Sequence, residues 1–83
     1  MEIKKGRIYR HFKGDYYIVI DTALNNEDER VYVIYRALYG DGQLFVRPLE
    51  DFTARVDRNK YSNATQEYKF ELQDINSINP THK

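Results

Sequence analysis

The chain has 83 residues, 13 basic and 13 acidic side chains, and no cysteine. This length predicts a single domain over residues 1–83, and the lack of cysteine excludes disulfides and thiolate–metal sites. A formal net charge of zero argues against a protein that holds a long nucleic acid by its phosphates, because such proteins usually carry a basic excess. The charge is uneven, with five basic residues in positions 1–20 and four acidic ones in 21–30, so a local anion site remains compatible with the composition.

The first half of the chain predicts three strands. Residues 7–12 are rich in strand-forming residues and end at a Lys-Gly-Asp turn signal at 13–15. A second strand is expected at 16–24, followed by a polar loop at 25–29. Residues 31–39 are apolar at nearly every position, which is typical of a central strand covered on both faces. Their Val, Ile and Tyr content favours a strand over a buried helix.

The middle of the chain predicts a turn and two further strands. Residues 40–42, Gly-Asp-Gly, reverse the chain. Residues 44–52 return as a strand, in which Pro48 marks an edge, an end or a bulge. A fifth strand is expected at 52–56.

The last part of the chain predicts a loop, one more strand and a tail. Residues 57–66 are polar and read as a loop with at most one helical turn. Residues 68–73 alternate between apolar and polar side chains, the pattern of a half-buried strand. A frayed tail is expected from about residue 76. Five to six short antiparallel strands with tight turns predict an all-β fold, a small SH3-like barrel or sandwich whose strand order stays open.

The turn at Gly40-Asp41-Gly42 decides how two arginines face each other. If Asp41 and Gly42 form a two-residue turn, Arg36 lies directly opposite Arg47. A three-residue loop would shift the register by one and separate them. We expect the paired register, because Asp-Gly is a strong signal for a two-residue hairpin turn.

Two arginines directly opposite each other repel, so an anion should compensate them. A carboxylate of the same chain, from Glu50, Asp51 or Asp21, would make this a structural ion-pair cluster. Simple exposure to solvent is a second possibility. The third is a bound ligand, since paired guanidinium groups suit phosphate geometry.

The ligand hypothesis names a set of candidate binding residues. Arg36 and Arg47 would hold a phosphate, and a tyrosine would stack on a base or close the pocket. Arg10 and His11 would extend the surface, although we prefer to interpret residues 9–12 as an ordinary strand with an aromatic core face and a polar outer face. The candidate site residues are Arg36, Arg47, Tyr35, Tyr39, Tyr9, Arg10 and His11.

Two motifs in these segments resemble a known family. They are GRIYRHFKGDYY at 6–17 and VIYRALYGD at 33–41, followed by VRP at 46–48 and Phe52. Together they resemble the domain-of-unknown-function family 1653, small bacterial and phage domains, over most of residues 6–72. The resemblance implies a compact β domain, often encoded alone, without a known reaction. It also implies that Arg10, Arg36 and Arg47 belong to the family pattern.

The sequence carries none of the motifs that catalysis needs. There is no nucleophile elbow, P-loop, dinucleotide fingerprint or metal-ligand spacing, so we expect neither an enzyme nor a cofactor or metal site. The hypothesis is a non-catalytic binding module for an anionic, nucleotide-like ligand, one form of which sequesters a nucleotide signal as some phage anti-defence proteins do. The alternative is a module that binds single-stranded nucleic acid or another protein.

Partners and location follow from the same features. A barrel of this size makes only a shallow pocket, so we expect a homo-oligomer with the site at or near a subunit interface. No apolar run is long enough to span a membrane, and the N-terminus has no apolar signal core. The sequence therefore predicts a cytoplasmic protein without a membrane partner.

Overall fold

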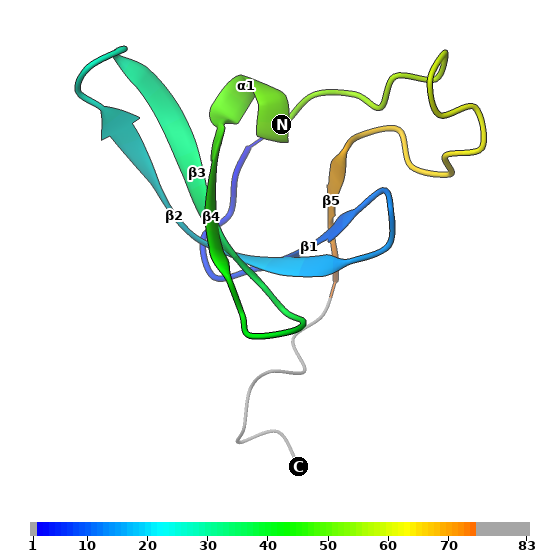
Figure 1. Cartoon of the computed structure of the whole chain (residues 1–83), viewed down its shortest axis with the longest axis horizontal. Coiled ribbons are helices and arrows are strands. Elements are labelled where there is room, and N and C mark those ends of the chain that lie inside the picture. The colour runs from blue at the N-terminus through cyan, green and yellow to red at the C-terminus, as the bar shows by residue number, and fades with distance from the viewer. Residues whose placement is uncertain (1, 75–83) are drawn as a thin grey trace.

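The computed structural model describes residues 2–74 and has one antiparallel sheet with a short helix (Figure 1). The elements are β1 (Ile8–His11), β2 (Tyr16–Asn25), β3 (Arg30–Ala37), β4 (Leu44–Pro48), α1 (Leu49–Phe52) and β5 (Phe70–Leu72). The strand order is β4-β3-β2-β1-β5, so β4 and β5 form the two edges of the sheet. The predicted all-β fold of short antiparallel strands is confirmed, although the sheet does not close into a barrel. The predicted tail lies outside the described residues.

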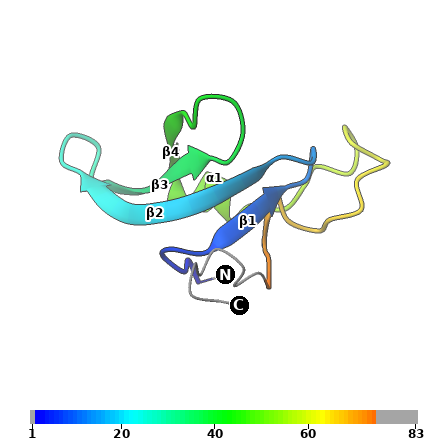
Figure 2. The same ribbon diagram turned by 90° about the horizontal axis from the view of Figure 1, so that it is seen from below.

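The sheet is strongly curled, and α1 lies on its concave side (Figure 2). The long strand β2 makes this possible because it pairs with β1 through its first residues and with β3 along most of its length. The β2–β3 ladder shifts between Val19 and Asp21, which leaves Ile20 as the extra residue of a bulge. A bulge bends its strand and increases the local twist, so β2 can belong to both halves of the curl. No helix within residues 2–74 is long and apolar enough to cross a membrane.

An aromatic core fills the concave side of the sheet. Its buried members are Tyr9, Val19, Val33, Tyr35, Phe52 and Phe70. The rings of Phe52 and Phe70 stack with centroids 4.0 Å apart, and Tyr35 meets both of them edge-on. Phe52 ends α1, which directly follows the edge strand β4, and Phe70 begins the other edge strand, β5. The stack therefore connects the two edges of the sheet.

Strand β3 is covered on one face only. Val33, Tyr35 and Ala37 are buried against the core, whereas Ile34 is half-buried and Arg36 is exposed on the other face. The prediction that this strand is covered on both faces is therefore wrong within the described part of the chain. The apolar residues on the outer face remain in contact with solvent.

The β3–β4 hairpin has a different register from the predicted one. Arg36 pairs with Leu44, and Arg47 pairs with Val33, so the two arginines lie on opposite faces of the sheet. The predicted two-residue turn is wrong because the loop spans 38–43 and both of its glycines adopt positive φ, 56° at Gly40 and 71° at Gly42. Gly tolerates this left-handed backbone without a steric cost, which permits the longer loop.

The segment after β4 also departs from the prediction. The expected strand at 44–52 ends at Pro48, and Leu49–Phe52 form one helical turn with two acidic residues in it. The fixed φ of proline and the favourable placement of acidic residues near a helix start explain the change. The expected strand at 52–56 is reduced to a single bridge between Arg55 and Tyr68.

We expect Phe70→Ala to destabilise the domain severely. Phe70 is 1% exposed and contacts most of the aromatic core, and truncating such a residue costs about 3–5 kcal/mol. This is a large part of the roughly 5–15 kcal/mol available to a small domain. Urea unfolding followed by circular dichroism measures the effect. Leu24→Ala is the matched control, because Leu24 is 65% exposed and its truncation should change stability by about 0.5 kcal/mol or less. Equal losses in both variants would contradict the assigned core.

Candidate anion site

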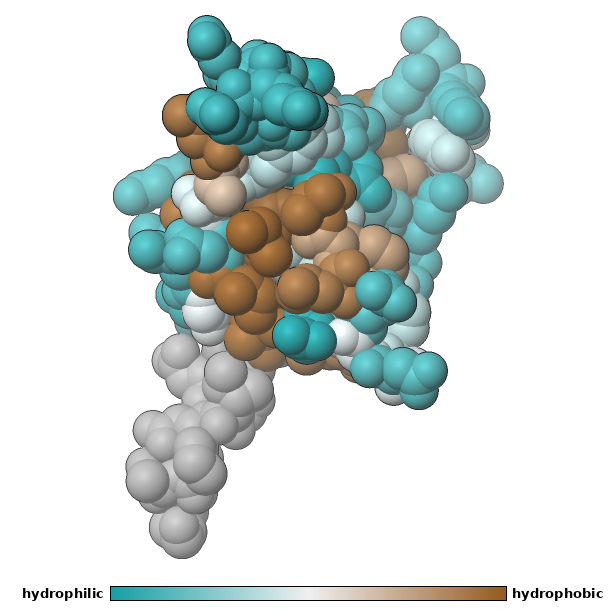
Figure 3. Space-filling view, turned by 60° about the vertical axis from the view of Figure 1, so that its left-hand side comes forward, coloured by the Kyte–Doolittle hydropathy of each residue, from teal (hydrophilic) through white to brown (hydrophobic). Residues whose placement is uncertain are grey.

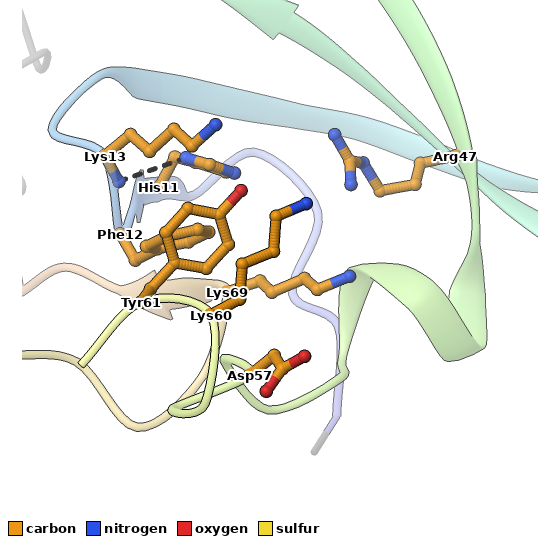
Figure 4. A pocket seen from close by; sticks show the side chains of 8 residues that line it. All are labelled: His11, Phe12, Lys13, Arg47, Asp57, Lys60, Tyr61 and Lys69. Atoms are coloured by element: carbon orange, nitrogen blue, oxygen red, sulfur yellow. Dashed lines mark hydrogen bonds between the residues drawn. The ribbon is translucent and has the colours of Figure 1, made fainter. Parts of the chain in front are cut away.

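A hollow of about 360 Å³ lies beside the open side of the curled sheet (Figure 4). It is formed by the end of β1 and the turn after it, by β4, and by the segment between α1 and β5. Four cationic side chains line it, namely Lys13, Arg47, Lys60 and Lys69. The other lining residues are the rings of His11, Phe12 and Tyr61 and the carboxylate of Asp57. We call this the cationic hollow.

Arg47 is held firmly at one side of the cationic hollow. Its Nε donates to the Tyr35 hydroxyl at 3.0 Å, and its Nη1 donates to Asp51 Oδ2 at 2.8 Å. Its guanidinium lies 5.1 Å from the centroid of the Phe70 ring, within cation–π range. The side chain is therefore fixed by contacts on three sides.

Asp51 links Arg47 to a second cation. Its Oδ1 accepts a hydrogen bond from Lys69 Nζ at 2.7 Å, so one carboxylate lies between two cationic groups. The hydrogen bond from Lys69, together with the one from Arg47, outweighs burial and lowers the pKa of Asp51 below its ordinary value of 3.8. This cluster carries one more positive charge than negative charge.

Lys13 and Lys60 lie on the other side of the cationic hollow, next to Tyr61. Their Nζ atoms are 5.2 and 5.4 Å from the centroid of the Tyr61 ring, and the Phe12 ring meets Tyr61 edge-on at 4.9 Å. Burial acts to raise the pKa of Tyr61, but the charges of Lys13 and Lys60 outweigh it, so the pKa is lowered. Within residues 2–74, neither lysine forms an ion pair with a carboxylate.

His11 contributes a neutral donor at the back of the cationic hollow. Burial, followed by the charges of Arg47 and Lys13, lowers the pKa of His11 below its ordinary value, which favours the neutral ring. Its Nδ1 accepts a hydrogen bond from the Lys13 backbone N–H at 3.1 Å, which assigns the ring proton to Nε2. Figure 4 shows the second ring nitrogen directed away from the Lys13 amide and toward the hollow.

Two of the sequence-predicted site residues, Arg47 and His11, line the cationic hollow. Two others belong to the core, since Tyr9 is 0% and Tyr35 is 4% exposed, and neither offers a ring face to a ligand. Asp51 was one of the carboxylates predicted to compensate the two arginines, and it forms an ion pair with one of them, Arg47.

The remaining predicted residues are engaged elsewhere. Arg36 donates to the Gly42 carbonyl at 2.8 Å and so fixes the β3–β4 loop on the outer face. Arg10 donates to the side chain of buried Gln66, which ties the 57–69 segment to β1. The Tyr39 hydroxyl lies 2.8 Å from that of Tyr17 on β2.

Sequence reasoning missed most of the cationic hollow. Lys13 stands in a turn signal, and Lys60 and Tyr61 stand in a loop whose position depends on long-range packing. The one signal in the sequence was for Lys69. The alternation of apolar and polar residues around Phe70 placed the Lys69 side chain on the face opposite that core residue. No group of three or more His, Asp or Glu side chains in residues 2–74 is arranged to hold a metal ion.

The comparisons with known proteins concern the whole domain. The family described as "Protein of unknown function (DUF1653)" matches residues 7–71, a range that contains every residue of the cationic hollow. A crystal structure of a DUF1653 protein from Bordetella bronchiseptica is similar, with 29% sequence identity and a TM-score of 0.69. The similarity covers 84% of this chain and 86% of that one. No curated protein sequence matches the chain.

We expect Asp51→Asn to lower stability in a pH-dependent way. Because the folded-state pKa of Asp51 lies below 3.8, its ionised form stabilises the folded state above that pH. The stability difference between wild type and D51N should be largest and constant at pH values above the pKa of Asp51 in the unfolded chain. It should shrink as the pH falls through the lower pKa that Asp51 has in the folded protein. Urea unfolding between pH 7 and pH 2.5 measures it.

The control for this prediction is Asp41→Asn. Asp41 lies in the β3–β4 loop and forms no ion pair within residues 2–74, so its replacement should leave stability unchanged at neutral pH. A D51N stability loss that is the same at every pH would contradict the proposed linkage.

Proposed function

Because the family match covers most of the chain, the protein belongs to the DUF1653 family, and we propose that it is a non-catalytic binding module for an anionic, nucleotide-like ligand. The observation that carries this proposal is the convergence of four cationic side chains on one small hollow of a protein whose net charge is zero. The site is the cationic hollow rather than the predicted arginine pair.

The unbalanced charge supports an anionic ligand. Two cations of the site share Asp51, whereas Lys13 and Lys60 have no carboxylate partner in the described part of the chain. Clustered like charges destabilise a folded protein, and a bound anion would relieve that repulsion. Arg supplies paired N–H donors and Lys supplies point charges, and both suit phosphate oxygens.

The rings beside the cations support a ligand that has a flat aromatic part as well as a phosphate. Tyr61 and Phe12 line the same hollow as the lysines, and base–aromatic stacking contributes about 1–3 kcal/mol per base. A phosphate that attracts Lys13 and Lys60 would draw both ammonium groups away from the Tyr61 ring and leave a ring face for the base. Inorganic phosphate alone would make no use of these rings.

The lining residues support binding without turnover. Among residues 2–74, Asp57 is the only carboxylate that lines the hollow, and no serine or threonine lines it. Hydrolytic chemistry normally requires a nucleophile with an adjacent base, or two carboxylates with different pKa values. One biological role for such a module is to hold a nucleotide signal and lower its free concentration.

We expect nucleotide binding to raise thermal stability, and Lys60→Gln and Lys13→Gln to weaken that effect. A ligand at a hundred times its dissociation constant adds about 2.7 kcal/mol of stability. Loss of one charged contact removes about 1.5–3 kcal/mol, which is a tenfold or larger loss of affinity. Thermal unfolding is measured with nucleoside mono-, di- and triphosphates, cyclic dinucleotides and inorganic phosphate. Mass spectrometry of the denatured protein identifies any ligand that copurifies, and it should be chemically intact.

Lys5→Gln is the matched control, because Lys5 pairs with Asp21 and does not line the cationic hollow. It should leave binding unchanged. No stabilisation by any phosphorylated compound, or equal losses in all three lysine variants, would refute the proposal. Tighter binding of a single-stranded oligonucleotide, with a steep loss of affinity on adding salt, would favour the alternative function.

A further inference from the structure

We propose that the protein forms a homodimer in which the free edge of β4 pairs antiparallel with β4 of a second copy, about a two-fold axis at Val46. Strand β4 ends the sheet, and only β3 pairs with it in residues 2–74. The proposal concerns this edge and the outer face of the sheet. Its evidence comes from groups that do not line the cationic hollow, although Arg47 of the same strand does.

Strand β4 leaves backbone groups free along its outer edge. The Ala37 N–H donates to the Gln43 carbonyl at 2.9 Å, which marks this pair as a hydrogen-bonded one. Bonded pairs recur at every second residue of an antiparallel ladder, so Leu44 and Val46 turn their N–H and C=O groups away from β3. An exposed edge of this kind is a template for pairing with another strand.

The side chains beside that edge are apolar and exposed. Leu44 is 43% and Val46 is 64% exposed on the outer face, where Val46 pairs with half-buried Ile34 of β3. Figure 3, in which the left-hand side of Figure 1 comes forward, shows hydrophobic side chains gathered in one area. Natural edge strands are usually protected by charged side chains or by proline. In β4 the proline stands only at the last position, and Leu44 and Val46 on the outer face carry no charge.

Strand β4 complements itself in the proposed register. Val46 of each copy would donate its N–H to the Val46 carbonyl of the other, and Leu44 would donate to the Pro48 carbonyl. Pro48 has no N–H to return, so the Leu44 carbonyl would lack a donor from the second copy. The Gln43 side chain already donates to that carbonyl at 3.2 Å. The one group that the pairing leaves unsatisfied is therefore satisfied within the chain.

The side-chain pairs of this register are also compatible. Val46 would face Val46 of the partner subunit, and this would cover the most exposed aliphatic side chain of β4. On the concave face, Arg47 would lie opposite Phe45 of the partner subunit, so no like charges meet directly. Because Arg47 lines the cationic hollow, this pairing would set an aromatic ring of the second copy at its rim.

A single-cysteine cross-link tests the pairing. The chain has no cysteine, so Val46→Cys introduces one unique thiol. In the dimer the two Cα atoms would lie about 5.5 Å apart, and a short bis-maleimide should join the subunits in high yield. Leu72→Cys is the matched control, since Leu72 is 36% exposed but lies on β5, at the opposite edge of the sheet. Equal or absent cross-linking in the two variants would overturn the proposal.

A second measurement separates edge pairing from other association. Sedimentation equilibrium of the wild type should show a dimer, and a wild type that is monomeric at every concentration would overturn the proposal. Val46→Pro removes an N–H that β3 does not use, so it should give a folded monomer by circular dichroism. Val46→Ile keeps that N–H and should remain dimeric. A folded V46P variant that stays dimeric would also overturn the proposal, and if V46P does not fold, the cross-link result decides.

Discussion

The stacking of Phe52 on Phe70 is the contact on which the rest of this structure depends. The sheet does not close through hydrogen bonds, because β4 and β5 are not paired. The stack, at 4.0 Å between ring centroids, joins the helical turn that follows β4 to the start of β5. It closes the fold by buried aromatic surface, which is the main favourable contribution available to a small chain without disulfides.

The same two segments carry the candidate site, one residue away from the stack. Asp51 precedes Phe52, and Lys69 precedes Phe70, and these two residues form an ion pair at 2.7 Å. Arg47 joins them from β4 and lies over the face of Phe70. The core contact therefore fixes the spacing of the charged groups, and the cationic hollow lies on the open side of the curled sheet. This gives the site a rigid wall despite the small size of the domain.

The sequence predicts the parts of this structure that depend on neighbouring residues. The turn signals and the β-branched residues located β1, β2 and β3 within a few positions. The arginine register was wrong because it depends on the backbone of Gly40 and Gly42, and the residue types alone permit more than one turn. The meeting of Lys60 with Lys13 depends on a long segment anchored by Gln66, which is a non-local arrangement that no spacing in the sequence encodes. A net charge of zero concealed this local excess.

Alternation along β4 connects the two proposals. Arg47 points to the concave side, where it lines the cationic hollow, whereas Val46 next to it points outward at the free edge. One short strand would thus present a ligand contact on one face and a subunit contact on the other. An anion on Arg47 and a second copy on Val46 would both restrict the same backbone, and thermodynamic linkage makes any such coupling reciprocal. The continuous apolar pattern of β3 fits this arrangement, since its inner face packs on the core and its outer face continues the hydrophobic surface that leads to β4.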